Sequence, residues 1–257
     1  MSYDLFRKLY ETYAAGVAYI AIRTPDGDER IGSAFHVGDG VFITAKHVVE
    51  GKKIVEIATT QNAMEEVEQR EGVRIMRITH HRGKGEIVKG PLYLSDENAD
   101  VAALIVKGIN APVIPVGDHL DDGIGTELVL RPVMVMGYPP IPFSREPTLV
   151  ATMAEVNAII DKYTGGHPHF ILSTMARGGF SGGLAITDYG CALGVITESL
   201  GINGQPIELG YLSVLSVEPI YNCLSQHKII PKTIFEMWGY DEEYTTGLNN
   251  EIQKSEK

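Results

Sequence analysis

A single serine stands among four glycines in the stretch Ala176-Arg177-Gly178-Gly179-Phe180-Ser181-Gly182-Gly183-Leu184. Glycine is needed where the backbone takes a positive φ or where another group must approach it closely. Both needs arise when a serine hydroxyl is presented beside a pair of backbone N–H groups. The pattern therefore suits Ser181 as a nucleophile, with the N–H groups of Gly179 and Ser181 as donors to an oxyanion. By itself such a cluster is also typical of an ordinary turn.

A phosphate-binding loop is the competing chemical interpretation of this stretch. Such a loop requires Lys-Ser or Lys-Thr after the last glycine and a helix to follow. Here Leu184-Ala185-Ile186-Thr187 has the pattern of a strand. We therefore set the phosphate interpretation aside.

A histidine and an aspartate could complete the chemistry of the serine. His47 follows the strand-like run 41–44 among small and apolar residues, where a histidine is usually a packing residue. Asp100 directly precedes the apolar run 101–106, so its carboxylate is expected at the edge of the core, where it needs a hydrogen-bonding partner. In the chain order His47, Asp100, Ser181, the three residues supply base, orienting acid and nucleophile for acyl transfer.

The remaining histidines and the cysteines are interpreted as structural or surface residues. His80 and His81 have no cysteine or second histidine cluster at metal spacing, and His167 and His169 are expected to be exposed in a glycine-rich loop. We expect no metal site and no cofactor. The two cysteines, Cys191 and Cys223, lie in apolar surroundings and are predicted to be core residues without a disulfide.

The elements expected to position these residues are mainly strands. Apolar residues at three- and four-residue spacings predict an amphipathic helix over residues 3–16. Strand patterns follow at 17–24, 30–37, 41–44, 52–60, 73–81, 101–106, 127–136, 148–160, 170–174, 184–187, 192–198 and 210–213, with a helix over about 217–226. The acidic segment with Glu65, Glu66, Glu68 and Glu71 is predicted to be a solvated turn or short helix.

Length and charge limit the classes of protein to be considered. At 257 residues and 44% apolar composition, the chain can form one large domain or two packed barrels. The net charge of −11 argues against nucleic acid and acidic membrane surfaces as partners. The chain has no apolar run of about eighteen residues, and its N-terminus lacks the pattern of a secretion signal. We therefore expect a cytoplasmic location.

Four ordered motifs resemble those of the trypsin/chymotrypsin-fold serine proteases: residues 32–35, 42–49, 100–104 and 179–183. The pattern is most similar to the bacterial HtrA-type peptidase domain, over roughly residues 17–225. The resemblance implies an all-β fold of two antiparallel six-stranded β-barrels with short N-terminal and C-terminal helices. The expected divisions are an N-terminal helix at 1–16, a first barrel at 17–110, a linker at 111–126, a second barrel with the C-terminal helix at 127–230 and a tail at 231–257. The implied activity is that of a serine endopeptidase acting on a protein or peptide through an acyl-enzyme.

The resemblance also implies contacts with a substrate. Met175, six residues before the nucleophile, would lie at the base of the P1 pocket and favour uncharged, small to medium apolar residues. The segment Thr197-Glu198-Ser199 would pair with the substrate backbone as an added strand, and the hydroxyl of Thr197 would support Asp100.

Some features depart from the family pattern. Phe180 stands where trypsins have an acid that receives a liberated N-terminus, which implies no zymogen activation of the trypsin kind, and Lys46 stands where a small residue is usual. The segment after residue 230 is too short for the PDZ domain of HtrA proteins. A catalytically inactive, protease-like protein that binds peptides or regulates a partner is therefore the alternative. An esterase of the α/β-hydrolase fold is disfavoured, because that fold orders its triad as serine, acid, histidine.

Overall fold

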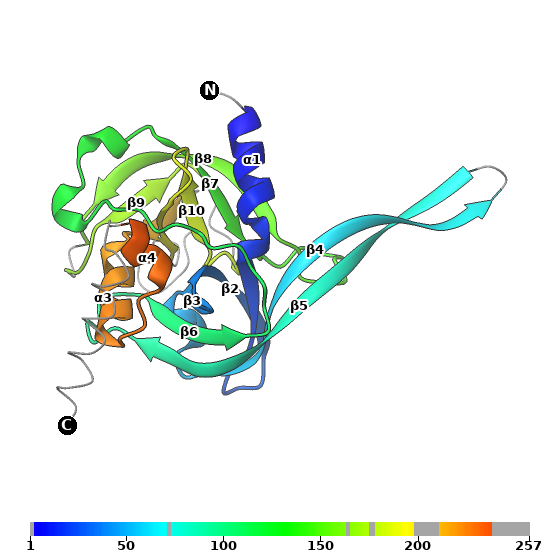
Figure 1. Cartoon of the computed structure of the whole chain (residues 1–257), viewed down its shortest axis with the longest axis horizontal. Helices are drawn as coiled ribbons and strands as arrows, with labels where there is room; N and C mark the ends of the chain where they lie inside the picture. Colours follow the sequence, from blue (N-terminus) through cyan, green and yellow to red (C-terminus); the bar gives the residue numbers. More distant parts are fainter. Residues whose placement is uncertain (1–2, 71–72, 163–164, 175–177, 198–210, 238–257) are drawn as a thin grey trace.

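The structure of the chain, a computed structural model, describes residues 3–70, 73–162, 165–174, 178–197 and 211–237. Its first half is a closed antiparallel barrel (Figure 1). The strands of this barrel are β1 (Val17–Arg23), β2 (Glu29–Gly38), β3 (Val41–Thr44), β4 (Lys53–Arg70), β5 (Val73–Tyr93) and β6 (Ala102–Lys107). They pair in the order β1-β2-β3-β6-β5-β4.

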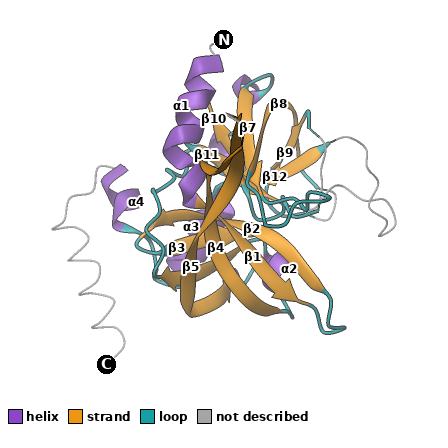
Figure 2. Cartoon of the chain, turned by 90° about the vertical axis from the view of Figure 1, so that its right-hand side faces the viewer, coloured by secondary structure: helices purple, strands orange, loops and turns teal. Residues whose placement is uncertain are grey.

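The second half forms another closed barrel. Its strands are β7 (Pro132–Gly137), β8 (Val150–Ile160), β9 (His169–Leu172), β10 (Leu184–Thr187), β11 (Ala192–Ile196) and β12 (Leu212–Leu215), paired in the order β10-β11-β12-β9-β8-β7. Figure 2 shows the two groups of strands, β1–β5 in one and β7–β12 in the other. The expected fold class, two antiparallel six-stranded barrels, is confirmed.

Short helices flank the barrels. They are α1 (Tyr3–Tyr13), α2 (Lys46–Val49), α3 (Glu218–Gln226) and α4 (Lys232–Met237), with single 3₁₀ turns η1 (Ala14–Gly16), η2 (Asp121–Gly123) and η3 (Thr126–Leu128). Helix α4 lies in the segment expected as a tail, and buried Ile234 holds it against the core. In the described part of the chain no helix is long and apolar enough to span a membrane.

Strands β4 and β5 continue well beyond the barrel as a long hairpin that projects from the molecule (Figure 1). The predicted turn or short helix over the acidic segment is therefore wrong. The register pairs Glu65 with Arg77 and Gln69 with Arg74. Pairing across the hairpin satisfies the backbone N–H and C=O groups of a segment that has no strand pattern of its own.

The strand expected over residues 127–136 begins only at Pro132. The preceding residues form the 3₁₀ turn η3, and Leu130 has a φ of 65°. A positive φ is incompatible with an extended strand. This segment therefore belongs to the connection between the barrels.

The connection between the barrels, residues 108–131, is hydrogen-bonded to both of them. The N–H of Ile114 donates to the carbonyl oxygen of His36 on β2 (2.9 Å). The N–H of Ala192 on β11 donates to the carbonyl oxygen of Pro115 (2.8 Å). These bonds limit the freedom of the barrels to move relative to each other.

Candidate active site

Strand register brings His47 and Asp100 to the same edge of the first barrel. Strands β3 and β6 are antiparallel neighbours, with Thr44 opposite Ala102. Strand β3 therefore ends where β6 begins. The chain leaves β3 into the single turn of α2, which carries His47, and enters β6 from a loop that ends near Asp100.

Both oxygens of Asp100 contact His47. Oδ2 lies 2.7 Å from Nδ1 of the ring, and Oδ1 accepts the backbone N–H of His47 at 2.9 Å. A proton on Nδ1 in this contact leaves Nε2 as the acceptor on the other side of the ring. The geometry suits an imidazole that takes a proton from a nucleophile.

The electrostatic environment keeps Asp100 ionised. Burial acts to raise the pKa of Asp100, but the hydrogen bonds and charge of His47 and the positive charge of Lys162 outweigh it. The pKa of the carboxyl group is therefore held below its ordinary value. At neutral pH the group is a carboxylate that can stabilise an imidazolium.

The turn that carries Ser181 is closely packed on its backbone. Gly179 and Gly182 have φ values of 90° and 82°. A Cβ atom would lie 2.3 Å from the carbonyl oxygen of Tyr138 at Gly179, and 2.1 Å from that of Ser33 at Gly182. Glycine is required at both positions by conformation and by space.

Ser33 joins this turn to the first barrel, a role for which the sequence gives no signal beyond the motif 32–35. Its N–H donates to the carbonyl oxygen of Ser181 (2.8 Å), and its hydroxyl donates to that of Gly179 (2.6 Å). The same hydroxyl accepts the N–H of Tyr138 (2.8 Å). Thr44 donates its hydroxyl to the carbonyl oxygen of Ser33 (2.7 Å). The serine turn is thus attached to the strand end that leads into His47.

The two expected oxyanion donors have no acceptor among the residues that the structure describes. Neither the N–H of Gly179 nor that of Ser181 donates a hydrogen bond within this part of the chain. Such N–H groups can bind an oxygen atom that carries developing negative charge.

The two histidines of the glycine-rich loop are not exposed as expected. His169 is the first residue of β9 and is only 2% exposed, with Nδ1 2.9 Å from the hydroxyl oxygen of Ser213. Burial, with the nearby charge of Lys162, lowers the pKa of His169 to about 4, so its ring is neutral at pH 7. His167 is partly buried and contacts Asp121. Strand β9 begins earlier than predicted, which places His169 inside the barrel wall.

Other predicted residues have the following positions. His81 is exposed, and the side chain of His80 lies outside the description. Cys191 and Cys223 are free thiols, and Cys223 is buried. Phe180 is 4% exposed and packs in the core of the second barrel. Nζ of Lys46 lies 3.6 Å from Oε1 of Glu50, which forms an ion pair one helical turn away.

The expected substrate contacts fall mostly outside the described residues. Met175, Glu198 and Ser199 belong to segments that the structure does not describe. Thr197 is buried, and its hydroxyl donates to the carbonyl oxygen of Ser213 (3.4 Å) instead of to Asp100.

The chain matches the model of the trypsin-like peptidase domain over residues 32–195. It belongs to this family. No curated protein matches the chain.

Solved structures of proteases share the fold of this family member. The HtrA-type protease AlgW with tripeptide is 20% identical, with a TM-score of 0.57, over 89% of this chain and 64% of AlgW. The active form of the Rv3671c protease from M. tuberculosis is 18% identical, with a TM-score of 0.58, over 86% of this chain and 85% of that protein. The serine endoprotease from Yersinia pestis is 17% identical, with a TM-score of 0.55, over 89% of this chain and 67% of that protein. The chain therefore spans less than two thirds of the length of AlgW.

Proposed function

We propose that the chain is a serine endopeptidase with His47 as base, Asp100 as orienting acid and Ser181 as nucleophile. The observation that carries this proposal is the two-point contact of Asp100 with His47 beside the attached serine turn. The family and the fold support a serine protease. The intact pair of base and acid favours an enzyme over the inactive, peptide-binding alternative.

In the proposed reaction, the hydroxyl oxygen of Ser181 attacks the carbonyl carbon of the scissile peptide bond. Nε2 of His47 takes the hydroxyl proton, and Asp100 stabilises the imidazolium. The N–H groups of Gly179 and Ser181 bind the negatively charged oxygen of the tetrahedral intermediate. The C–N bond then breaks as the imidazolium gives its proton to the leaving amine. Water, deprotonated by His47, hydrolyses the acyl-enzyme and regenerates the serine.

For specificity, we propose a P1 pocket with Met175 at its base and a substrate backbone paired with the segment 197–199. This part of the proposal rests on the resemblance of the motifs to trypsin-fold proteases. A thioether side chain has no charge to meet Lys or Arg, so uncharged P1 residues such as Val, Ala, Leu or Met are expected.

The test is covalent labelling with an active-site serine phosphonate, read out as intact mass. We expect one adduct per chain, on Ser181, and none on Ser181→Ala. The same substitution should lower peptide hydrolysis by about four to six powers of ten and leave the circular dichroism spectrum unchanged. An unlabelled wild-type protein would favour the inactive alternative, and full hydrolysis by Ser181→Ala would exclude the proposed nucleophile.

A further inference from the structure

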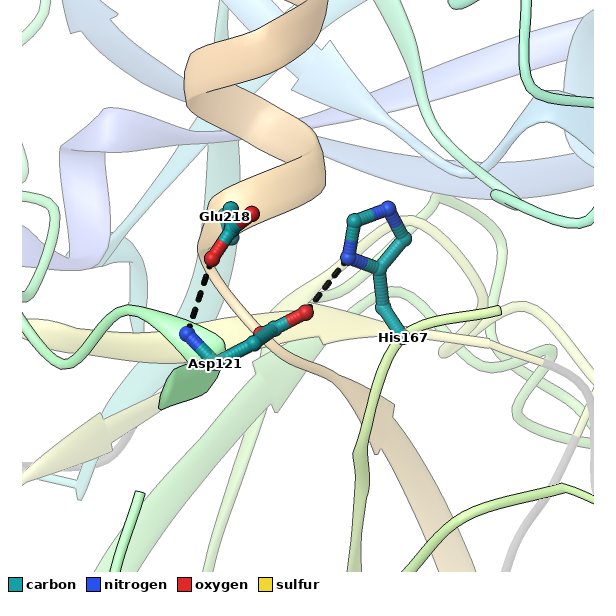
Figure 3. Close-up of side chains that lie close together, drawn as sticks. All are labelled: Asp121, His167 and Glu218. Carbon is teal, nitrogen blue, oxygen red and sulfur yellow. Dashed lines mark hydrogen bonds and ion pairs between the residues drawn. The ribbon is translucent and has the colours of Figure 1, made fainter. Parts of the chain in front are cut away.

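Three side chains of metal-ligating type converge at a point that the proposed chemistry does not use. Asp121 comes from η2 in the connection between the barrels, His167 from the loop before β9, and Glu218 from the start of α3. One potential ligand atom of each lies within 4.8 Å of the others. Figure 3 shows the three side chains close together. The group shares no residue with the proposed triad.

Negative charge exceeds positive charge around this imidazole. Oδ2 of Asp121 lies 2.5 Å from Nδ1 of His167, and Oδ2 of Asp96 lies 3.7 Å from Nε2. Glu218 is held beside them, because its Oε2 accepts the N–H of Asp121 (2.9 Å). With three carboxylates around one imidazole, the group is net negative even when the ring is protonated. The side chains of His167 and Asp121 are only 14% and 19% exposed, so water screens this excess poorly. A divalent cation would offset most of this negative charge.

The surrounding contacts resemble the outer shell of a metal site. Ser216 donates its hydroxyl to Oδ1 of Asp121 (2.6 Å), which leaves Oδ2 directed at the ring of His167. Asp96 faces the other ring nitrogen. Without an ion, the 2.5 Å contact is a hydrogen bond that places the ring proton on Nδ1. A cation at Nδ1 would replace that proton, and the ring would then carry its proton on Nε2, the nitrogen that Asp96 faces at 3.7 Å.

The candidate ligand atoms are close enough together for small movements to bring all three to a small divalent ion. Ligand bonds of about 2.0–2.2 Å place neighbouring ligand atoms about 3.0–3.5 Å apart. The contact of His167 with Asp121 would lengthen slightly, and Glu218 would move toward them. A hollow of about 570 Å³, lined in part by Asp121, Asp122 and Glu218, adjoins the group and offers a route for the ion and its water ligands.

We propose that Asp121, His167 and Glu218 bind one divalent transition-metal cation, with water completing its coordination. One imidazole nitrogen with two carboxylates suits Zn²⁺ better than Ca²⁺, which prefers oxygen ligands alone. The bound ion would link the connection between the barrels, the β8–β9 loop and α3. Its expected effect is therefore on stability, and the proposal does not depend on peptidase activity.

The test uses the whole chain, treated with EDTA and dialysed into metal-free buffer. Zn²⁺ is titrated by isothermal titration calorimetry, and thermal melting is measured in parallel. We expect one saturable site per chain with a Kd below about 10 µM, and a melting temperature that rises with Zn²⁺. Mn²⁺ should bind more weakly than Zn²⁺.

Two ligand variants, one variant of the neighbouring Asp96 and one reference variant assign the site. His167→Asn and Glu218→Gln should each weaken Zn²⁺ binding at least about tenfold, and Asp96→Asn should weaken it by about 10- to 100-fold. Glu218→Gln keeps the shape and the acceptor of its residue, so it serves if His167→Asn does not fold. His47→Asn should retain the site, which distinguishes it from Zn²⁺ bound by the His47–Asp100 pair.

Four results would overturn the proposal. The first is the absence of saturable Zn²⁺ binding by the folded wild-type chain. The second is unchanged affinity in Glu218→Gln and in folded His167→Asn, and the third is loss of the site in His47→Asn alone. A preference for Ca²⁺ over Zn²⁺ would likewise exclude an imidazole-containing site. None of these readouts requires hydrolysis, so failure here is distinguishable from failure of the proposed peptidase function.

Discussion

Asp100 interacts with His47 through both carboxylate oxygens, and this contact lowers the pKa of Asp100 below its ordinary value of 3.8. A carboxyl group with a depressed pKa adds to folding stability at neutral pH. That contribution is lost only as the pH falls below 3.8 through the folded value. Between pH 5 and 8 the acid of the pair is therefore always ionised.

The proposed mechanism predicts how the rate of hydrolysis depends on pH, because Asp100 stays ionised while His47 must be neutral to act as the base. Only the neutral imidazole of His47 can accept the proton of Ser181, so the protonated form is inactive. We expect kcat/KM on the acidic side to fall about tenfold per pH unit, because one proton is involved. Initial rates measured from pH 5 to 8 test this. A flat profile would contradict the role of His47, and a fall of about a hundredfold per unit would require a second group to titrate.

We expect Ser33 to position the turn that carries Ser181, because it bonds to the carbonyl oxygens of Gly179 and Ser181. In Ser33→Ala the carbonyl oxygen of Gly179 and the N–H of Tyr138 lose their hydroxyl partner in a fully buried place. Such a loss costs about 1–3 kcal/mol and frees the serine turn to reorient. We expect kcat to fall about ten- to a hundredfold with KM little changed.

The matched control for Ser33→Ala is Thr187→Val, which also removes a buried hydroxyl. Thr187 is 2% exposed and contacts the carbonyl oxygen of Cys191 (3.2 Å), at a hairpin outside the serine turn. It should lose stability and keep kcat. Equal kcat values for the two variants would show that Ser33 is only structural.

At the scale of elements, the β4–β5 hairpin separates into a part that closes the barrel and a part that projects from it. Strand β1 pairs with β4 no further than Ala58, and β6 pairs with β5 from Glu86 onward. In the described strands, the residues between these limits pair only across the hairpin itself. An isolated two-stranded ribbon has little stability of its own.

We therefore expect the projecting part to be dispensable for folding. Residues 62–80 are replaced by Asn-Gly, which joins the paired residues Gln61 and His81 through a two-residue turn. The free energy of unfolding in urea should change by less than about 1 kcal/mol. Ile57→Ala, inside the barrel and 1% exposed, should lose about 2–5 kcal/mol in the same assay. A comparable loss in the shortened chain would show that the hairpin supports the barrel.

At the scale of the whole molecule, the side chain of Tyr138 crosses from the second barrel into the first. Its hydroxyl lies 3.2 Å from the N–H of Thr60, 3.0 Å from the hydroxyl of Thr60 and 3.3 Å from the carbonyl oxygen of Val17. Its ring meets that of Tyr19 edge to face, with centroids 5.6 Å apart. The barrels are thus joined by polar and aromatic contacts.

Tyr138→Phe tests how much these polar contacts stabilise the assembled barrels. Removing the buried hydroxyl should lower the free energy of unfolding by about 1–2 kcal/mol, because its partners in the first barrel lose a hydrogen bond. Urea denaturation measures this loss. Tyr211→Phe, at a tyrosine that is 46% exposed, should change stability by less than about 0.5 kcal/mol. An equally small change in Tyr138→Phe would mean that the hydroxyl does not join the barrels.

The sequence by itself predicted a chain made mainly of strands and the candidates for the proposed reaction, and the resemblance of its motifs to trypsin-fold proteases implied the two barrels. Its motifs are local: a strand end before His47, an acid before an apolar run, and glycines around Ser181. Local pattern is sufficient there, because strand alternation and turn chemistry depend on neighbouring residues. The antiparallel register of β3 and β6 then brings two of these residues into contact.

Only the tertiary structure decided the features that depend on distant segments. The acidic strand of the hairpin takes its conformation from pairing with β5, against its own local pattern. Ser33 holds a turn nearly 150 residues away, as its bond to Gly179 shows. Asp121, His167 and Glu218 carry no local signal, because their ligand geometry exists only after the connection, the β8–β9 loop and α3 meet. Contacts between residues far apart in the chain follow from packing, which a one-dimensional pattern does not encode.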